Sequence, residues 1–270
     1  LDIGLFSRVN VSLDWYTRTT KDLLMSKQLN SISGFSSLLT NVGQMRNTGV
    51  ELEVRSNNIK TKDFSWTTAF NLSHNKNKIL KLADLPWFVD GRYVRKEGYP
   101  FNTIYLREYA GVGPETGSAL YYDNQQDENG NYTKNKVTDP GQASPIPLKD
   151  ITPTISGGFM NTFNYKFIDL SFNLSYSFGG YSYDNASYIL QDDGYSVISN
   201  KSTEQRRRWQ KPGDITDVPR FVYGNKKGGN YNSSRAIHST DHIRLKSLIL
   251  GLNAPKAWLQ KLGIGNARIY

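Results

Sequence analysis

Residues 169–180 read DLSFNLSYSFGG, and this stretch decides the fold class of the chain. Its large apolar side chains fall on every second residue: Leu170, Phe172, Leu174, Tyr176 and Phe178. Polar side chains fill the positions between them: Asp169, Ser171, Asn173, Ser175 and Ser177. Because successive side chains of a β-strand point to opposite faces, this alternation predicts a strand whose two faces meet different environments.

The same period of two recurs along the chain. It predicts β-strands near 5–18, 46–56, 62–75, 99–110, 118–123, 152–165, 168–180, 239–252 and from 265 onward. A soluble β-sandwich also alternates, but its strands usually have ~5–6 residues, whereas a tilted strand that crosses a bilayer needs ~9–11. The lengths of several of these runs therefore favour a membrane barrel.

The connections between the expected strands alternate between long and short. The long ones are 19–45, 76–98, 124–151 and 181–238. The short ones are 57–61, 111–117, 166–167 and 253–264. Outer-membrane barrels have long extracellular loops and short periplasmic turns, so this alternation indicates an all-β, antiparallel transmembrane barrel.

Parts of this pattern are irregular. The runs 99–110 and 118–123 alternate poorly, so YLREYAGVGPETGSALYYD (105–123) is alternatively a single excursion between strands. In 239–252 the phase breaks at residues 248–250, which a β-bulge would explain. The segment APKAWLQKLGIG (254–265) predicts a short helix that begins after Pro255 and stops at Gly263.

The composition is polar and yet rich in rings. The chain has 270 residues, of which 37% are hydrophobic and 13% aromatic, with a mean hydropathy of −0.56, which argues against a thick core. With no Cys, disulfides and thiol chemistry are excluded. No run approaches the ~18 apolar residues of a membrane helix. Because the chain begins and ends inside strand-like patterns, we expect it to be a piece of a longer protein.

The net charge has two interpretations. Lys and Arg total 33 and Asp and Glu total 24, which gives +9 and could indicate nucleic acid or an anionic surface. The chain carries no recognisable nucleic-acid-binding signature, and its basic residues are spread through the expected loops. We therefore predict no nucleic-acid partner.

No combination of side chains predicts an active site, a metal site or a cofactor. His74, His238 and His242 are favoured as surface or lumen residues over metal ligands. The loop YYDNQQDENGNY (121–132) resembles a calcium loop in composition, but Glu128 stands where an EF-hand has its turn glycine. A polar loop is the favoured interpretation, and we expect no enzyme activity.

We expect two roles for the aromatic residues. Rings near the ends of strands would form the girdles that hold a barrel at its height in the bilayer. Rings in loops would instead stack on the flat faces of sugars, and Arg206 heads a basic cluster, RRRW (206–209), that would attract an acidic substrate, although a solvated loop is the simpler interpretation. The candidate substrate-binding residues are Trp87, Tyr93, Tyr195, Trp209 and Arg206.

Seven blocks of the sequence together resemble one known family. They are DWYTRTTKDLLMS, NVGQMRNTGVELEV, FSWTTAFNLSHNKNKILKL, EGYPFNTIYLREYAGVGPETGSALYYD, PTISGGFMNTFNYKFIDLSFNLSYSFGG, RRRWQKPGDITDVPR and HIRLKSLILGLNAPKAWLQKLGIGNARIY. In this order they resemble the mid-to-late barrel of the SusC/RagA-type TonB-dependent outer-membrane transporters. The resemblance covers nearly the whole chain.

The resemblance implies a fold and a function. Such transporters have a single-chain barrel of twenty-two strands around an N-terminal plug. They import bulky nutrients, typically glycans or peptides, with a SusD-like surface lipoprotein, and draw energy from TonB and its ExbB/ExbD motor. Residues 1–270 would then be a partial barrel domain in outer-membrane lipid, with the plug, the TonB-contacting segment and the final strands outside this sequence.

The barrel hypothesis assigns the two faces of the strands. A first set would line a hydrated lumen: Asp14, Glu51, Glu53, Arg55, Asn71 and Asn173. A second set would face lipid: Leu170, Phe172, Leu174 and Phe178. Two alternatives remain at this point, a TonB-dependent receptor for a metal chelate and a soluble carbohydrate-binding β-sandwich.

Overall fold

The chain forms two compact units. A computed structural model describes residues 1–270 except 30, 31, 33, 36, 42, 83–85, 226–230 and 261–262. The sheet unit comprises Leu1–Ala83, Thr152–Gly180 and Thr240–Tyr270, and the loop unit comprises Asp84–Ile151 and Tyr181–Ser239. Among the described residues, no helix has the length and apolar character needed to cross a membrane.

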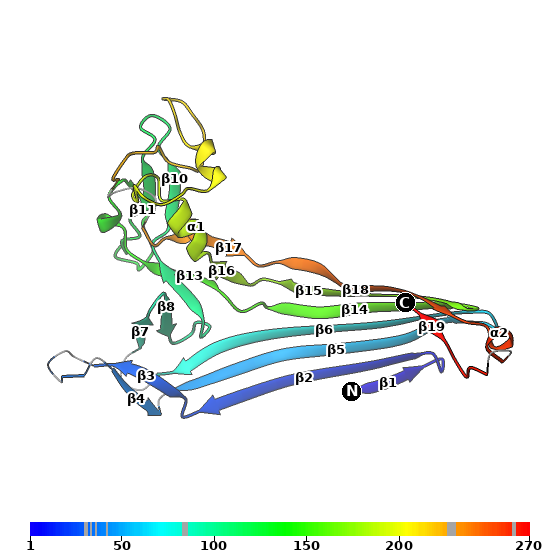
Figure 1. Cartoon of the computed structure of the whole chain (residues 1–270). Helices are drawn as coiled ribbons and strands as arrows, with labels where there is room; N and C mark the ends of the chain where they lie inside the picture. The colour runs from blue at the N-terminus through cyan, green and yellow to red at the C-terminus, as the bar shows by residue number, and fades with distance from the viewer. Residues whose placement is uncertain are drawn as a thin grey trace. The chain divides into compact units, whose positions relative to one another are not determined.

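The sheet unit is built on one antiparallel sheet (Figure 1). Its order is β1-β2-β5-β6-β14-β15-β18-β19. The bounds are β1 Asp2–Leu5, β2 Val9–Lys21, β5 Gln44–Lys60, β6 Phe64–Lys81, β14 Ile155–Tyr165, β15 Ile168–Phe178, β18 His242–Asn253 and β19 Arg268–Ile269. A separate hairpin pairs β3 (Leu24–Gln28) with β4 (Ser37–Asn41). The predicted all-β class is confirmed.

The central strands are longer than the sequence predicts. With 17 residues in β5 and 18 in β6, each would span about 55–60 Å at about 3.3 Å per residue. The sequence pattern predicts only 46–56 and 62–75. The additional residues of β6 pair with β5, for example Asn77 with Asn47 and Lys78 with Arg46, so the ladder continues where the apolar alternation of β6 stops.

The register confirms the prediction of which side chains lie on the same face of the sheet. One row across the sheet contains Val11, Val54, Phe70, Phe159, Leu174 and Leu245. A row of the opposite parity contains Ser12, Glu53, Asn71, Gly158, Ser175 and Arg244. The two residue sets assigned from the sequence thus lie on opposite faces of one sheet.

The irregular features of β18 and of the segment after it are also confirmed. Asn173 pairs with Ser247 and Leu174 pairs with Leu245, so Lys246 is the extra residue of a β-bulge. The bulge moves the apolar residues from odd to even positions and so keeps Leu245 and Leu248 on the same face. Helix α2 spans Lys256–Gln260, and Gly263 follows it with a φ of 65°.

Two strand predictions are wrong. Residues 99–110 and 118–123 do not enter the eight-stranded sheet, because β6 pairs directly with all 11 residues of β14. They form the short strands β9 (Thr103–Leu106), β10 (Tyr109–Val112) and β11 (Ala119–Tyr122) of the loop unit. The alternative prediction of a single excursion is therefore the correct one, and the alternation of long and short connections survives without these strands.

The expected first strand, 5–18, is interrupted by a turn. Phe6 and Ser7 both have a φ of 53°, and the Arg8 amide donates to the Leu5 carbonyl at 3.0 Å. This two-residue turn joins β1 to β2 as a hairpin. Left-handed residues at both central positions suit the right-handed twist of hairpin strands, even though neither residue here is Gly or Asn.

Two tyrosines lie across glycines of neighbouring strands. Tyr176 pairs with Gly157, and its hydroxyl donates to the Asn71 carbonyl at 2.7 Å, one strand further on. A Cβ at Gly157 would lie 2.1 Å from that carbonyl oxygen and 2.4 Å from the Tyr176 hydroxyl. On the opposite face, Tyr16 covers Gly49 in the same way.

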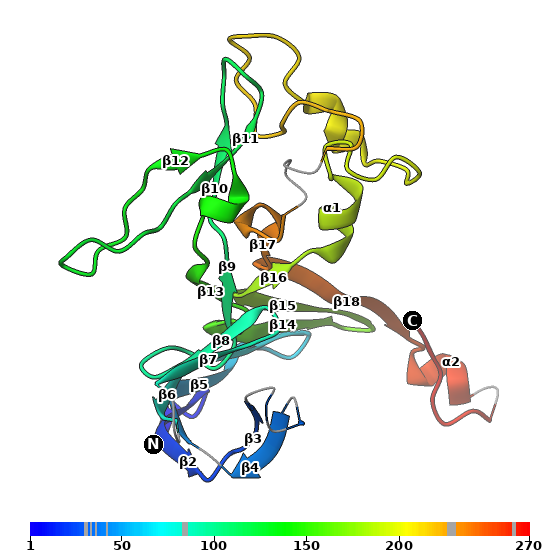
Figure 2. The same ribbon diagram turned by 90° about the vertical axis from the view of Figure 1, so that its left-hand side faces the viewer.

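The loop unit contains shorter sheets with a small core. One sheet has the order β13-β9-β8-β7, with β7 Trp87–Asp90, β8 Tyr93–Lys96 and β13 Ile146–Asp150. A second joins β10, β11 and β12 (Lys136–Val137), and a third pairs β16 (Tyr181–Tyr183) with β17 (Ile237–Ser239). Figure 2 shows β12 and helix α1 (Asn185–Leu190) on opposite sides of this unit. Tyr121 is fully buried between Ala119 and Ala143.

The contact between Tyr176 and Gly157 predicts a difference between adjacent glycines. Gly157→Ala is expected to destabilise the fold by about 1–3 kcal/mol, because the new methyl group meets backbone and ring atoms that are held in place. Gly158→Ala is the control, since its Cβ would lie at least 3.4 Å from any neighbour. Thermal unfolding of both variants measures the difference, and equal midpoints would contradict the prediction.

Candidate functional site

The apolar face of the long sheet forms a continuous band of exposed and half-buried side chains. Exposed fractions are 72% for Trp15, 67% for Ile243, 62% for Leu248 and 59% for Leu250. In a soluble sandwich such a face would be covered by a second sheet. A row of this kind along six strands is suited to an apolar medium.

The apolar band has a defined boundary at the end of the sheet where β2 and β6 lead into long connections. Its last apolar row contains Trp15, Val50, Ile155 and Phe178, together with His74. The next two rows on the same face are polar: Thr17, Thr48 and Lys76, followed by Thr19, Arg46 and Lys78. The ends of β2, β5 and β6 therefore continue beyond the apolar band with polar side chains on this face.

Rings gather at the other end of the band, near the short turns. Trp66 stacks on Phe163 with ring centroids 5.5 Å apart, and Phe64 pairs with Tyr165 in the next row. Trp15 lies at the opposite edge. Amphipathic rings at both edges are typical of the girdles of membrane barrels.

One polar cluster lies on the apolar face. Asn161, which is 2% exposed, accepts hydrogen bonds from the Trp66 indole at 2.8 Å and from the Thr68 hydroxyl at 2.7 Å. The Asn58 amide in turn donates to the Thr68 hydroxyl at 2.7 Å. Shared hydrogen bonds lower the cost of placing these groups among apolar neighbours.

The opposite face is polar and carries charges. Asp14, Glu51, Ser73, Ser156, Ser177 and His242 form one row, and the next row contains Glu53 and Arg244. Arg55 and Glu53 form an ion pair at 2.5 Å, with side chains 71% and 47% exposed. These polar and charged groups favour contact with water, because charges are costly to place in an apolar medium.

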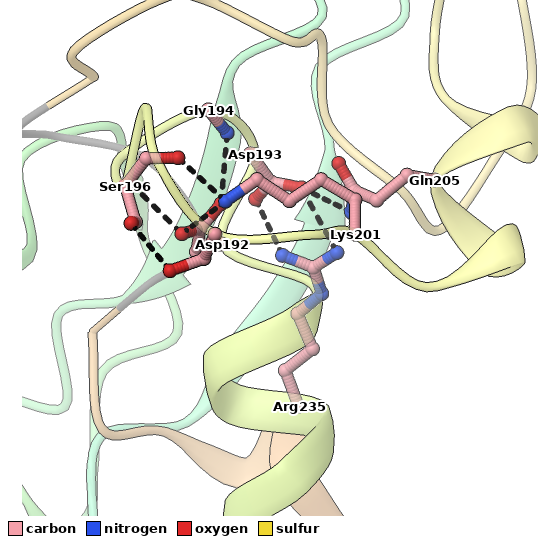
Figure 3. A network of polar contacts seen from close by, with 8 residues as sticks. Asp192, Asp193, Gly194, Ser196, Lys201, Gln205 and Arg235 are labelled. Atoms are coloured by element: carbon pink, nitrogen blue, oxygen red, sulfur yellow. Dashed lines mark hydrogen bonds and ion pairs between the residues drawn. The ribbon is translucent and has the colours of Figure 1, made fainter.

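The loop unit is held together by a buried charge network (Figure 3). Asp193 is fully buried and accepts two hydrogen bonds from the Arg235 guanidinium, at 2.5 and 3.1 Å, and one from the Gln205 amide at 3.0 Å. The adjacent Asp192 binds Lys201 at 2.6 Å and accepts from the Ser196 amide at 2.9 Å. The network joins segments that are distant along the chain.

The electrostatics of this network favour the charged pair. Burial would lower the pKa of Arg235, but the charge and hydrogen bonds of Asp193 outweigh it and raise the pKa above its ordinary value. Burial also raises the pKa of Tyr109, whose ring lies 5.6 Å from the Arg235 guanidinium carbon. Neither group titrates near neutral pH, so we interpret the network as a structural clasp.

The candidate residues Trp87 and Tyr93 lie in the same short sheet. Trp87 is 45% exposed on β7, and its ring lies 6.0 Å from that of Tyr105 on β9. Tyr93 begins β8 and is half-buried, with the Arg95 guanidinium carbon 5.4 Å from its ring centre. The Trp87 ring is therefore accessible, whereas the Arg95 guanidinium lies close to the Tyr93 ring.

The other three candidates lie between residues 195 and 209, outside the sheet that holds these two. Trp209 donates to the Pro114 carbonyl at 2.7 Å, and its ring lies so close to Gly117 that a Cβ there would be 2.4 Å away. Tyr195 is 52% exposed beside the charge network. Arg206 is exposed on a short 3-10 helix, Thr203–Arg207. The five candidates thus do not form one site.

The acidic loop 121–132 is explained by its own hydrogen bonds. Asp127 accepts from the amides of Asn129 at 2.9 Å and Asn131 at 2.8 Å. Asp123 accepts from Thr133 and Asn135. Within the described part of the chain, no three His, Asp or Glu side chains group as they would around a metal ion.

Comparison with known proteins gives the class of the chain. No protein-family model matches it. TonB-dependent receptor P3 of Formosa agariphila is 34% identical over 289 residues, which cover 100% of this chain and 28% of that receptor. TonB-dependent receptor SusC of Bacteroides thetaiotaomicron is 27% identical over 285 residues, which cover 100% of this chain and 27% of SusC.

Solved structures agree with the sequence relatives. The match to the structure of the RagAB peptide transporter has a TM-score of 0.83 and a sequence identity of 29%. It covers 97% of this chain and 29% of the matched RagAB chain. The fold and the relatives agree on the TonB-dependent receptors as the class to which the chain is similar. The chain belongs to the SusC/RagA family of these transporters, as the sequence predicts, and spans less than a third of the length of the relatives it matches.

The charge network predicts a large local effect in the loop unit. Asp193→Asn is expected to lower the stability of residues 181–239 by about 3–5 kcal/mol, because it leaves the Arg235 charge buried without its partner. Hydrogen–deuterium exchange across this segment measures the loss of protection. Glu204→Gln is the control, because the exposed Glu204–Arg207 pair contributes about 0–1 kcal/mol. Equal protection in both variants would contradict the clasp.

Proposed function

We propose that this chain is part of the barrel wall of an outer-membrane, TonB-dependent importer of bulky nutrients. The observation that carries the proposal is the sheet whose one face is a bounded apolar band and whose other face is charged. The relatives named as TonB-dependent receptors support it. The proposed protein is a transporter and has no catalytic site.

The two faces have different roles in this proposal. The face with Leu170, Phe172, Leu174 and Phe178 contacts lipid, and the face with Glu51, Glu53 and Asn173 lines the lumen. The part of β5 from Val50 to Ile59, which crosses the apolar band, has 10 residues, or about 33 Å along the strand. Tilted by about 40°, it covers about 25 Å, the height of the apolar band of such barrels.

The long connections lie at the extracellular end of the strands in this proposal. Antiparallel pairing makes the connections after β2, β6 and β15 leave from one end of the sheet, and the short turns before β2, β6 and β15 lie at the other. The first end takes up the substrate and contacts a SusD-like surface lipoprotein. Energy comes from TonB and ExbB/ExbD through a region outside this sequence.

Glycans or peptides are the proposed substrates. Support comes from SusC among the relatives and from the solved RagAB structure, which is described as a peptide transporter. A soluble carbohydrate-binding sandwich is disfavoured by the exposed apolar band. The metal-chelate receptor remains the second candidate, and the uptake experiment below distinguishes it.

Adjacent residues of β15 test the assignment of faces. The chain has no Cys, so each substitution introduces a single thiol into it. In outer-membrane vesicles that carry the full-length protein, Asn173→Cys is expected to react with a membrane-impermeant maleimide. Leu174→Cys is expected to react at least tenfold more slowly, because lipid excludes the reagent and the thiolate. Equal labelling rates would contradict the assignment.

Uptake by whole cells tests the transport function. Cells that express the full-length protein with its lipoprotein partner are supplied with labelled oligosaccharides, peptides or ferric chelates. We expect uptake of an oligosaccharide or a peptide that stops when TonB is deleted or when the proton gradient is collapsed. Uptake restricted to ferric chelates would favour the second candidate. Uptake unaffected by TonB would contradict the proposal.

A further inference from the structure

A hollow of about 480 Å³ lies within the loop unit. Strands β7, β8 and β9 form one wall, and the loop that begins at Asn124 forms another. All its lining residues lie between 87 and 147, in one continuous segment. Its volume falls in the range of about 300–1,000 Å³ that is typical of small-molecule sites.

Three aromatic rings line the hollow. Trp87 is 45% exposed, and its ring meets that of Tyr105 at 6.0 Å and an angle of 49°. Tyr132, which is 36% exposed, also lines the hollow. Burial raises the pKa of Tyr105, with a smaller contribution from Tyr132, so the Tyr105 hydroxyl remains a neutral donor.

A buried amide donor lines the same hollow. Asn124 is 2% exposed and has a φ of 49°, a left-handed conformation that Asn tolerates better than most residues. Its Oδ1 accepts from the Lys134 ammonium at 3.0 Å, but its Nδ2 has no hydrogen-bond partner in the protein. A buried donor left unpaired costs about 1–3 kcal/mol, so a ligand acceptor at this position would recover that cost.

The remaining lining groups are mostly neutral. Gln125 and Ser144 add an amide and a hydroxyl that lie 3.5 Å apart, and Lys96 is the one charged residue of the lining. The Lys96 ammonium already lies 5.1 Å from the ring centre of Tyr99. Flat rings combined with neutral donors and acceptors suit a ligand with apolar C–H faces and many hydroxyls, and they suit the charged groups of a peptide less well.

We propose that this hollow binds one or two pyranose units of an oligosaccharide, with a sugar face on Trp87 and a hydroxyl that accepts from Asn124 Nδ2. The proposal rests on the proposed import function and narrows its substrate to a glycan. It also separates Trp87 from Trp209, whose ring is already covered by Gly117. Trp87 is thus the candidate predicted from the sequence that lines the hollow, and Asn124, Tyr105 and Tyr132 are further binding residues that the structure indicates.

Calorimetry on the full-length protein with its lipoprotein partner, in lipid nanodiscs, tests the site. The probes are neutral hexaoses of glucose, galactose, mannose and xylose, with a decapeptide for comparison. For the hexaose that binds, Trp87→Ala is expected to weaken the affinity at least tenfold. Asn124→Asp is expected to weaken it about three- to tenfold, because the carboxylate keeps the contact with Lys134 but removes the donor.

Tyr223→Ala is the matched control, because Tyr223 is 78% exposed and does not line the hollow. If a hexaose binds and Trp87→Ala and Asn124→Asp both keep wild-type affinity, the hollow is not the site, while the import function stands. If only the decapeptide binds and is imported, the site is likewise overturned. If a hexaose binds through Trp87 and Asn124 but nothing is imported, the site stands and the import function fails.

Discussion

The hydrogen-bonded ladder between the long strands determines where every side chain of the sheet lies. β14 pairs with β6 on one side and with β15 on the other over all its 11 residues, so the parity of one strand sets that of its neighbours. A slip by one residue would move an apolar row to the charged face. In a bilayer the ladder is also obligatory, since no water is present to bind free backbone groups. The bulge at Lys246 shows the constraint: the extra residue is accommodated without displacing Leu248 from its row.

This dependence explains which parts of the sheet the sequence predicts. Where one face is apolar, as in Leu170–Phe178, alternation predicts both the strand and its faces. It fails at the outer end of β6, where Lys76, Asn77 and Lys78 are polar on both faces and the period of two disappears. It also fails for 99–110, where a short strand buries adjacent residues such as Thr103 and Ile104 and so has no polar face. In both cases pairing with distant segments, which leaves no periodic signal, decides the structure.

The loop unit is less accessible to sequence analysis. Asp193 and Arg235 are separated by 42 residues, and nothing in the composition of either segment indicates that they meet. The aromatic candidates share a residue type but differ in surroundings, since Trp209 is used in packing and Trp87 is accessible. The sequence identifies Asn124 only as part of a polar loop, because its burial depends on how that loop folds against β7–β9.

The pairing of Tyr176 with Gly157 restricts which of the two residues can be replaced over time. A side chain cannot be gained at Gly157 while the tyrosine covers it, because the new atom would meet both the ring hydroxyl and the Asn71 carbonyl. The tyrosine, in contrast, can be replaced first, at the cost of one hydrogen bond. Loss of the ring removes only one of the two obstacles at Gly157, because the Asn71 carbonyl oxygen, 2.1 Å from the Cβ position, stays in place. Related sequences should therefore keep the glycine even where the tyrosine has been replaced.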